Sequence, residues 1–288
     1  MKSLKEYIYE VSLNEGLLDR VKNKEVNHKV LIEEFLEANY HFGDSYTIKD
    51  TNNGFIVDAR GDIMVKNKNI TSLTNGLFEF GEVDGFFCED CKLLQSLKGA
   101  PRNVNLDFYC TKCDSLKTLE GAPEMVQCSF NCRGCKSLKT LEGAPKEVWG
   151  SFVCADCKSL KTLEGAPKAL GVDFICDGCE SLKTLEGAPE KVWGAFGCTD
   201  CKSLTSLKGA PQKVEGGFFC NKCDSLTSLK GAPEKVGRRF NCSLCKSLKT
   251  LEGAPKKVVD NFYCYDCGVQ FTKEDVKKHT NVAGSIYT

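Results

Sequence analysis

Residues 126–167 read VQCSFNCRGCKSLKTLEGAPKEVWGSFVCADCKSLKTLEGAP, which is two consecutive copies of one unit. The unit can be written V-x-x-x-F-x-C-x-x-C-x-S-L-x-[ST]-L-x-G-A-P. Its Cys-x-x-Cys pair begins at residues 88, 110, 132, 154, 176, 198, 220, 242 and 264, a constant step of 22 residues. A regular period of this length is typical of a solenoid, in which each repeat forms one coil stacked on the next.

The unit also predicts which side chains point into the solenoid. Phe130 and Cys132 are two residues apart, so they share one face of a short strand, and we expect that face to point inward. The side chains expected to point inward from the return path are Cys135, Leu138, Leu141 and Val148. Gly143 permits an unusual backbone angle and Pro145 lacks a backbone donor, so Gly-Ala-Pro is expected to close each coil.

Stacking places equivalent side chains of successive coils next to one another. At the ~4.8 Å spacing of neighbouring strands, the coils would form a parallel sheet about 40 Å long. The residues expected to form one continuous spine are Phe86, Phe108, Phe130, Phe152, Phe174, Phe196, Phe218, Phe240 and Phe262.

The spacing within the unit resembles a known family. Phe, the first Cys, the second Cys and Leu fall at offsets 0, 2, 5 and 8, as in FNCRGCKSL from Phe130 to Leu138. This matches the leucine-rich-repeat core, with Phe and Cys replacing the two strand leucines. The chain resembles leucine-rich-repeat proteins, closest to the bacterial BspA-like type, over residues 83–267. The resemblance implies a leucine-rich-repeat-like stack of about nine coils with a parallel β-sheet, and it says little about function.

The residues before the repeats are predicted to cap the stack, because an open solenoid end exposes an apolar cross-section. We expect residues 16–82 to form a small α/β capping region. Residues 27–40 have the spacing of an amphipathic helix. Residues 56–83 look like a degenerate coil, in which Ile63 and Val65 stand where Phe and Cys would be.

Residues 268–288 are predicted to cap the other end. Thr272-Lys-Glu-Asp275 resembles a capping box that opens a short helix ending near His279. The final GSIYT could add a closing strand.

The first residues, 1–15, are either a targeting leader or a flexible segment. They resemble the N-terminal capsid-targeting segment of internal virion proteins in T-even-like tailed phages. Ile8-Tyr9-Glu10 and Leu13-Asn14-Glu15 fit the hydrophobic-x-Glu pattern that the prohead protease of those phages cuts. The resemblance implies a packaged virion protein with a removable address, whereas an ordinary amphipathic helix start explains the same residues equally well.

Charge and hydropathy limit the partners. The 39 Lys and Arg residues balance the 39 Asp and Glu residues, which argues against nucleic acid because no global basic field exists. No stretch approaches the ~20 apolar residues that cross a bilayer, and the first residues lack the apolar core of a secretory signal. We therefore expect a cytoplasmic phage or bacterial protein with no membrane partner, or a virion component.

The 19 cysteines allow two chemistries, and their odd number rules out complete internal disulfide pairing. Our preferred interpretation is two ladders of buried free thiols with no cofactor, since cysteine packs well as a small apolar residue. The alternative is zinc shared by paired coils, for example through Cys132, Cys135, Cys154 and Cys157, in a structural or nucleic-acid-binding array. Disulfides are disfavoured because cytosolic thiols stay reduced.

The residue between Phe and the first Cys is predicted to face outward on the sheet. Most members of this row are apolar or aromatic, which favours a protein-binding face, although strand propensity alone would select the same residue types. The predicted partner-binding residues, including two tryptophans one row over, are Phe87, Tyr109, Asn131, Trp149, Val153, Ile175, Trp193, Phe219, Asn241 and Tyr263.

No catalytic or nucleotide-binding motif accompanies the repeats, and the chain has only 3 histidines to act as general bases. We therefore expect no enzyme. The leading hypothesis is a non-catalytic interaction protein whose sheet face binds a macromolecule, most simply a protein.

Overall fold

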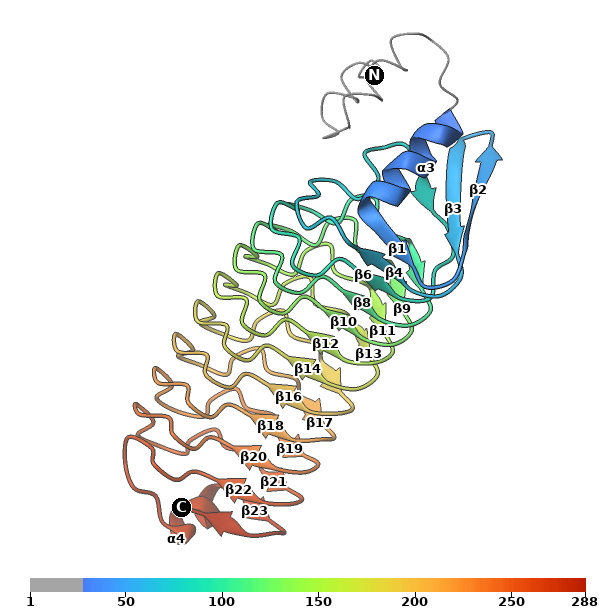
Figure 1. Ribbon diagram of the computed structural model, residues 1–288. Coiled ribbons are helices and arrows are strands. Elements are labelled where there is room, and N and C mark those ends of the chain that lie inside the picture. Colours follow the sequence, from blue (N-terminus) through green and yellow to red (C-terminus); the bar gives the residue numbers. More distant parts are fainter. Residues whose placement is uncertain (1–27) are drawn as a thin grey trace.

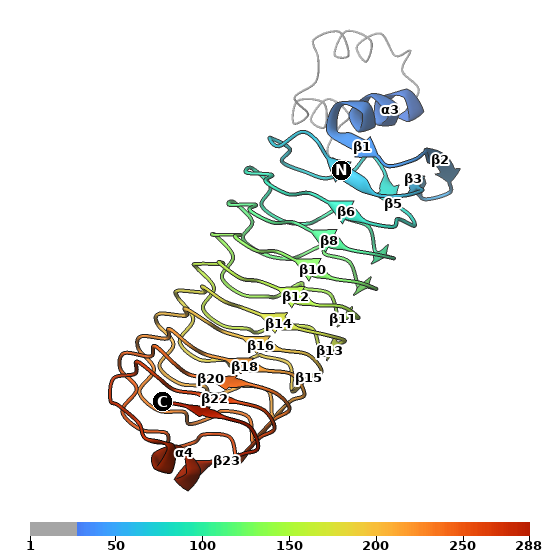
Figure 2. The ribbon, with the colours of Figure 1, turned by 60° about the horizontal axis from the view of Figure 1, so that its bottom comes forward.

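The computed structural model describes residues 28–288 and shows a β-solenoid whose coils stack along one axis (Figure 1). Helix α3 (His28–Asn39) lies at one end of the stack and helix α4 (Lys273–His279) at the other. Figure 2 shows the same stack tilted, with each coil following the path of its neighbours. The predicted solenoid of 22-residue coils is confirmed.

One sheet runs the length of the solenoid. Its strands pair in the order β1-β4-β6-β8-β10-β12-β14-β16-β18-β20-β22-β24, and every pair after the antiparallel β1–β4 pair is parallel. We call it the main sheet. Its strands are β1 (Tyr40–Phe42), β4 (Ile63–Val65), β6 (Phe86–Phe87), β8 (Phe108–Tyr109), β10 (Phe130–Asn131), β12 (Phe152–Val153), β14 (Phe174–Ile175), β16 (Phe196–Gly197), β18 (Phe218–Phe219), β20 (Phe240–Asn241), β22 (Phe262–Tyr263) and β24 (Ile286–Tyr287).

A second side of each coil also carries strands, which the sequence analysis did not predict. A four-stranded parallel sheet contains β7 (Asn103–Val104), β9 (Met125–Val126), β11 (Glu147–Val148) and β13 (Ala169–Leu170). A five-stranded parallel sheet continues with β15 (Lys191–Val192), β17 (Lys213–Val214), β19 (Lys235–Val236), β21 (Lys257–Val258) and β23 (Asn281–Val282). Each strand is two residues long with one inward side chain, too short for an alternating pattern to stand out from a loop.

The N-terminal cap joins the main sheet directly. Ile63 pairs with Phe86, so the degenerate coil occupies the position that the sequence predicted. A small sheet of β2 (Tyr46–Thr51), β3 (Gly54–Ala59) and β5 (Glu79–Phe80) lies beside it. Tyr40 and Phe80 contact the first ring of the spine, Phe86, with ring centroids 6.4 and 5.4 Å away, so aromatic side chains cover this end of the core.

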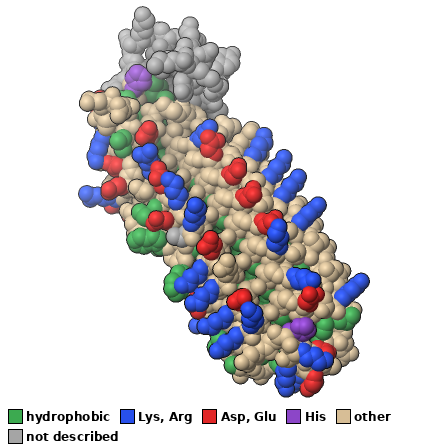
Figure 3. Space-filling model, turned by 180° about the vertical axis from the view of Figure 1, so that it is seen from behind, with side chains coloured by type: hydrophobic (Ala, Val, Ile, Leu, Met, Phe, Trp, Pro, Cys, Tyr) green, Lys and Arg blue, Asp and Glu red, His purple; other side chains and the backbone are tan. Residues whose placement is uncertain are grey.

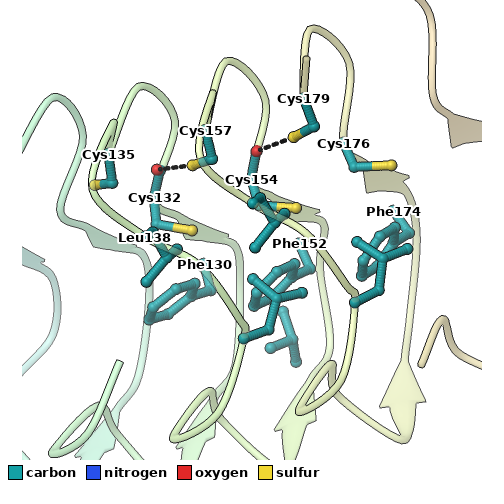
Figure 4. Close-up of a cluster of buried hydrophobic side chains, with 14 of the residues drawn as sticks. Phe130, Cys132, Cys135, Leu138, Phe152, Cys154, Cys157, Phe174, Cys176 and Cys179 are labelled. Carbon is teal, nitrogen blue, oxygen red and sulfur yellow. Dashed lines mark hydrogen bonds between the residues drawn. The ribbon is translucent and has the colours of Figure 1, made fainter. Parts of the chain in front are cut away.

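The core is the predicted phenylalanine spine. From Phe86 to Phe262, successive rings stack with centroids 5.1 to 5.6 Å apart, and all of these rings are fully buried. Figure 4 shows Phe130, Phe152 and Phe174 in this stack. Stacked rings at this separation add to the apolar area that each phenylalanine buries.

The predicted turns and C-terminal cap are also present. Gly143 has φ +84°, and a Cβ there would come within 2.5 Å of the Glu120 backbone nitrogen. The glycine therefore allows both the positive φ angle and the close approach of the preceding coil. The capping box of Thr272 and Asp275 opens α4, and β24 extends the main sheet beyond the last repeat.

Candidate functional site

The Cys-x-x-Cys motif supplies a regular hydrogen bond between coils. From the second Cys-x-x-Cys coil onward, the thiol of the second cysteine donates to the backbone carbonyl oxygen of the first cysteine in the preceding coil, as from Cys157 to Cys132 at 3.2 Å and from Cys179 to Cys154 at 3.3 Å (Figure 4). Eight such bonds, at 3.1 to 3.3 Å, come from Cys113, Cys135, Cys157, Cys179, Cys201, Cys223, Cys245 and Cys267. The sequence analysis predicted the ladders but not this role.

Burial keeps the Cys154, Cys198 and Cys264 thiols protonated. Desolvation raises the pKa of Cys154 and Cys198 well above the ordinary thiol value, and it raises the pKa of Cys264 to about 12. The thiolate is the nucleophile and the metal ligand, so these side chains are unreactive at neutral pH. The geometry suits packing and hydrogen bonding.

The zinc alternative would need different geometry. Between residues 28 and 288, no group of three or more His, Cys, Asp or Glu side chains is arranged to hold a metal ion. Within the proposed set of Cys132, Cys135, Cys154 and Cys157, the Cys157 thiol points its proton at a carbonyl. Zinc would have to displace that proton, and metal content is the direct test of this hypothesis.

The predicted outward row lies along the main sheet in register. Phe87 pairs with Tyr109, Asn131 with Val153, and so on along the stack. The Phe87 and Tyr109 rings meet edge to face at 5.3 Å. The row residues that we predicted as contacts are half-buried, namely Phe87, Tyr109, Asn131, Val153, Ile175, Phe219, Asn241 and Tyr263. The structure therefore brings these predicted residues together on one face.

The two tryptophans lie elsewhere on each coil. Trp149 follows β11 and Trp193 follows β15, so both stand at the corner between the second side of the coil and the main sheet. Each is 57% exposed. Gly171 occupies the same position in the coil between them, where a Cβ would collide with the carbonyl oxygen of Trp149.

A hollow of about 550 Å³ opens beside Trp193 at this corner. Gly194, Gly216 and Gly217 leave room for it because they carry no side chain. The other lining residues are Asp173, Trp193, Ala195, Glu215, Phe219, Arg238, Arg239 and Asp260. The sequence analysis missed this hollow; its signal is a cluster of glycines at the corner positions of consecutive coils.

The carboxylates of the hollow already have partners. Asp260 pairs with Arg239 at 3.4 Å, and the Asp173 carboxylate accepts the Ala195 backbone N–H at 2.6 Å. Glu215 pairs with Lys213, and this contact lowers the pKa of the Glu215 carboxyl. Arg238 forms no ion pair with any residue from 28 to 288.

Comparison with known proteins gives no relative: no family model, no curated protein and no solved structure matches the chain. No helix in the part of the chain that the structure describes is long and apolar enough to cross a membrane. The predicted leader, residues 1–15, lies outside the described residues.

Proposed function

We propose that this chain is a non-catalytic interaction protein that binds a protein partner on the outward face of the main sheet and the adjoining corner. The observation that carries the proposal is the in-register row from Phe87 to Tyr263, which is half-exposed at every coil except at Gly197. Aromatic residues on a rigid sheet lose little entropy on binding, and they are enriched among residues that dominate protein interfaces.

The two tryptophans favour a binding face over strand propensity as the reason for the exposed aromatic residues. Propensity explains Tyr109 or Ile175, which lie inside strands. It does not explain Trp149 and Trp193, which lie outside any strand and expose more than half of their surface. Exposed tryptophans beside an apolar row fit a binding face better than a solvated one.

The evolutionary and cellular parts of the proposal rest on sequence. The offsets shared with BspA-like leucine-rich repeats support kinship with that type, and the inward positions that they imply are the buried ones here. A cytoplasmic phage or bacterial protein, or a packaged virion component, fits the leader resemblance and the balanced charge.

The test compares single substitutions on the proposed face. Tyr109→Ala, Trp149→Ala and Phe219→Ala should each weaken the same partner captured by the immobilised full chain, while circular dichroism stays unchanged. Lys139→Ala, an exposed residue outside the strands, is the matched control. If all three aromatic substitutions leave every detected interaction intact, the sheet-face proposal is wrong.

A further inference from the structure

Four lysines form an in-register ladder on the second side of the solenoid. Lys191 pairs with Lys213, Lys213 with Lys235, and Lys235 with Lys257 across β15, β17, β19 and β21. Three steps of the ~4.8 Å strand spacing give the ladder a length of about 14 Å. Like charges directly opposite one another on a sheet are destabilising, so the ladder has an energetic cost.

The ladder is not a general feature of the repeat. The equivalent positions in the four-stranded sheet are Asn103, Met125, Glu147 and Ala169, none of which is basic. The lysines therefore occupy four consecutive coils in one half of the solenoid. A requirement of the coil itself would have placed them in both halves.

The ladder adjoins the hollow. The Lys191 ammonium lies 3.3 Å from the ring centroid of Trp193, and Lys213 pairs with Glu215 on the hollow wall. Lys235, Lys257 and Arg238 are exposed, and none of them forms an ion pair with another residue in the range 28–288. The view from behind shows Lys and Arg side chains along the whole solenoid, interspersed with Asp and Glu, and one group of them lies next to hydrophobic side chains toward the C-terminal end (Figure 3).

We infer that this surface binds an acidic segment of a partner protein, with carboxylates on the unpaired cations and an apolar or aromatic side chain in the hollow beside Trp193. We call it the lysine corner and define it by Lys191, Lys213, Lys235, Lys257 and Arg238. The inference rests on the proposed function, since it assumes a protein partner, and it adds the chemistry of the segment that is recognised.

The charges favour an acidic peptide over nucleic acid. Asp173, Glu215 and Asp260 line the hollow and would repel a continuous row of phosphates. A peptide can place an uncharged side chain against those carboxylates and its own acidic groups against the lysines on either side. Two aromatic residues, Trp193 and Phe219, line the hollow, which suits one large apolar side chain.

The experiment measures binding of a defined probe to the full chain by fluorescence anisotropy. The probe is a fluorescein-labelled peptide, Glu-Glu-Tyr-Glu-Glu-Tyr-Glu-Glu, and the comparison probes replace Glu by Gln, Tyr by Ser, or the peptide by an oligothymidine of the same length. We expect the acidic peptide to bind more tightly than each comparison probe, with an affinity that falls as salt rises.

Two charge-matched variants localise the binding. The triple variant Lys235→Glu, Arg238→Glu, Lys257→Glu should lower the affinity for the acidic peptide about tenfold or more, since three favourable charge contacts become unfavourable. Lys139→Glu with Lys161→Glu and Lys183→Glu makes the same change in net charge outside the corner and should leave affinity unchanged. Trp193→Ala should lower the affinity for the peptide that contains Tyr and leave the affinity for the peptide that contains Ser unchanged.

Four results would overturn the inference: no binding of the acidic peptide, equal weakening by both triple variants, unchanged affinity in the corner variant, or tighter binding of the oligothymidine. The proposed function is tested separately, because it depends on a captured partner and on Tyr109 and Trp149, neither of which lines the hollow. Loss of peptide binding with retained dependence on those aromatic residues would reject the lysine corner alone.

Discussion

The thiol-to-carbonyl bond predicts that the two cysteines of one motif differ in their contribution to stability. Cys198 and Cys201 belong to the same coil and are both fully buried. The Cys201 thiol donates to the Cys176 carbonyl at 3.3 Å, whereas the Cys198 thiol donates to no carbonyl between residues 28 and 288. Substituting each by alanine removes the same atoms and differs only in this bond.

The expected magnitudes follow from that difference. Removing a buried sulfur costs about 0.8 kcal/mol, by analogy with a methylene, plus a small cavity term. Cys201→Ala also leaves the Cys176 carbonyl without this partner, which adds ~1–3 kcal/mol. We therefore expect Cys198→Ala to lower the free energy of unfolding by about 1 kcal/mol and Cys201→Ala by ~2–4 kcal/mol.

Urea denaturation under reducing conditions, followed by far-ultraviolet circular dichroism, gives the free energy of unfolding of each variant. The comparison holds if both variants keep the dependence of that free energy on urea concentration that the original protein shows. Cys201→Ser retains a donor and should recover part of the loss. Equal destabilisation by Cys198→Ala and Cys201→Ala would refute the reasoning, because the bond would then contribute nothing beyond packing.

Four further outcomes follow from the thiols and the leader. In the native chain iodoacetamide should modify half-exposed Cys128 and Cys267 first and the buried ladder cysteines only after unfolding. Peptide mass spectrometry would show the order, and early labelling of Cys198 would contradict its burial. Burial raises the pKa of Cys198 in the folded chain, so above the unfolded thiol pKa of about 8.5 the folded state binds more protons than the unfolded state. The stability of the fold should therefore be highest below that pH and should fall as the pH rises to about 9.5 in the presence of a reductant. An unchanged melting temperature over this pH range would contradict the prediction. A chelator should leave the melting temperature unchanged and elemental analysis should find almost no zinc, whereas about four ions per chain would establish the shared-coil alternative. If the leader is cut, protein from virions should begin after Glu10 or Glu15, and an intact Met1 would count against packaging.

Sequence periodicity predicted the inner part of the coil well. Phe130, Cys132 and Leu138 repeat at fixed offsets, and only an inward, stacked arrangement uses an apolar side chain at the same position in every coil. The cap coil could be found in the same way, since Ile63 and Val65 keep the spacing of the Phe and Cys that they replace. These features depend on one residue pattern and need no knowledge of distant contacts.

The remaining features depend on contacts between coils. The bond from Cys179 to Cys154 joins residues 25 positions apart, and its direction is set only once the coils are stacked. The second set of strands has the same origin, because a lone inward Val148 between exposed neighbours looks like a loop until Val126 is placed beside it. The hollow at Trp193 lies where glycines carry no side chain, and an absent side chain leaves no pattern of apolar or charged residues in the sequence.

In a solenoid built from nearly identical coils, the positions that depart from the repeat carry the information about function, because the repeated positions are already explained by stacking. The strands on the second side divide between β13 and β15, and that division separates two different surfaces. On the N-terminal side the strands carry no lysine at their first position. On the C-terminal side four lysines follow one another, and the first of them contacts Trp193 at the edge of the hollow. A charged ladder that costs stability and begins where a hollow opens is more simply explained by a ligand than by the fold, so the lysine corner is the first surface to test for partner chemistry.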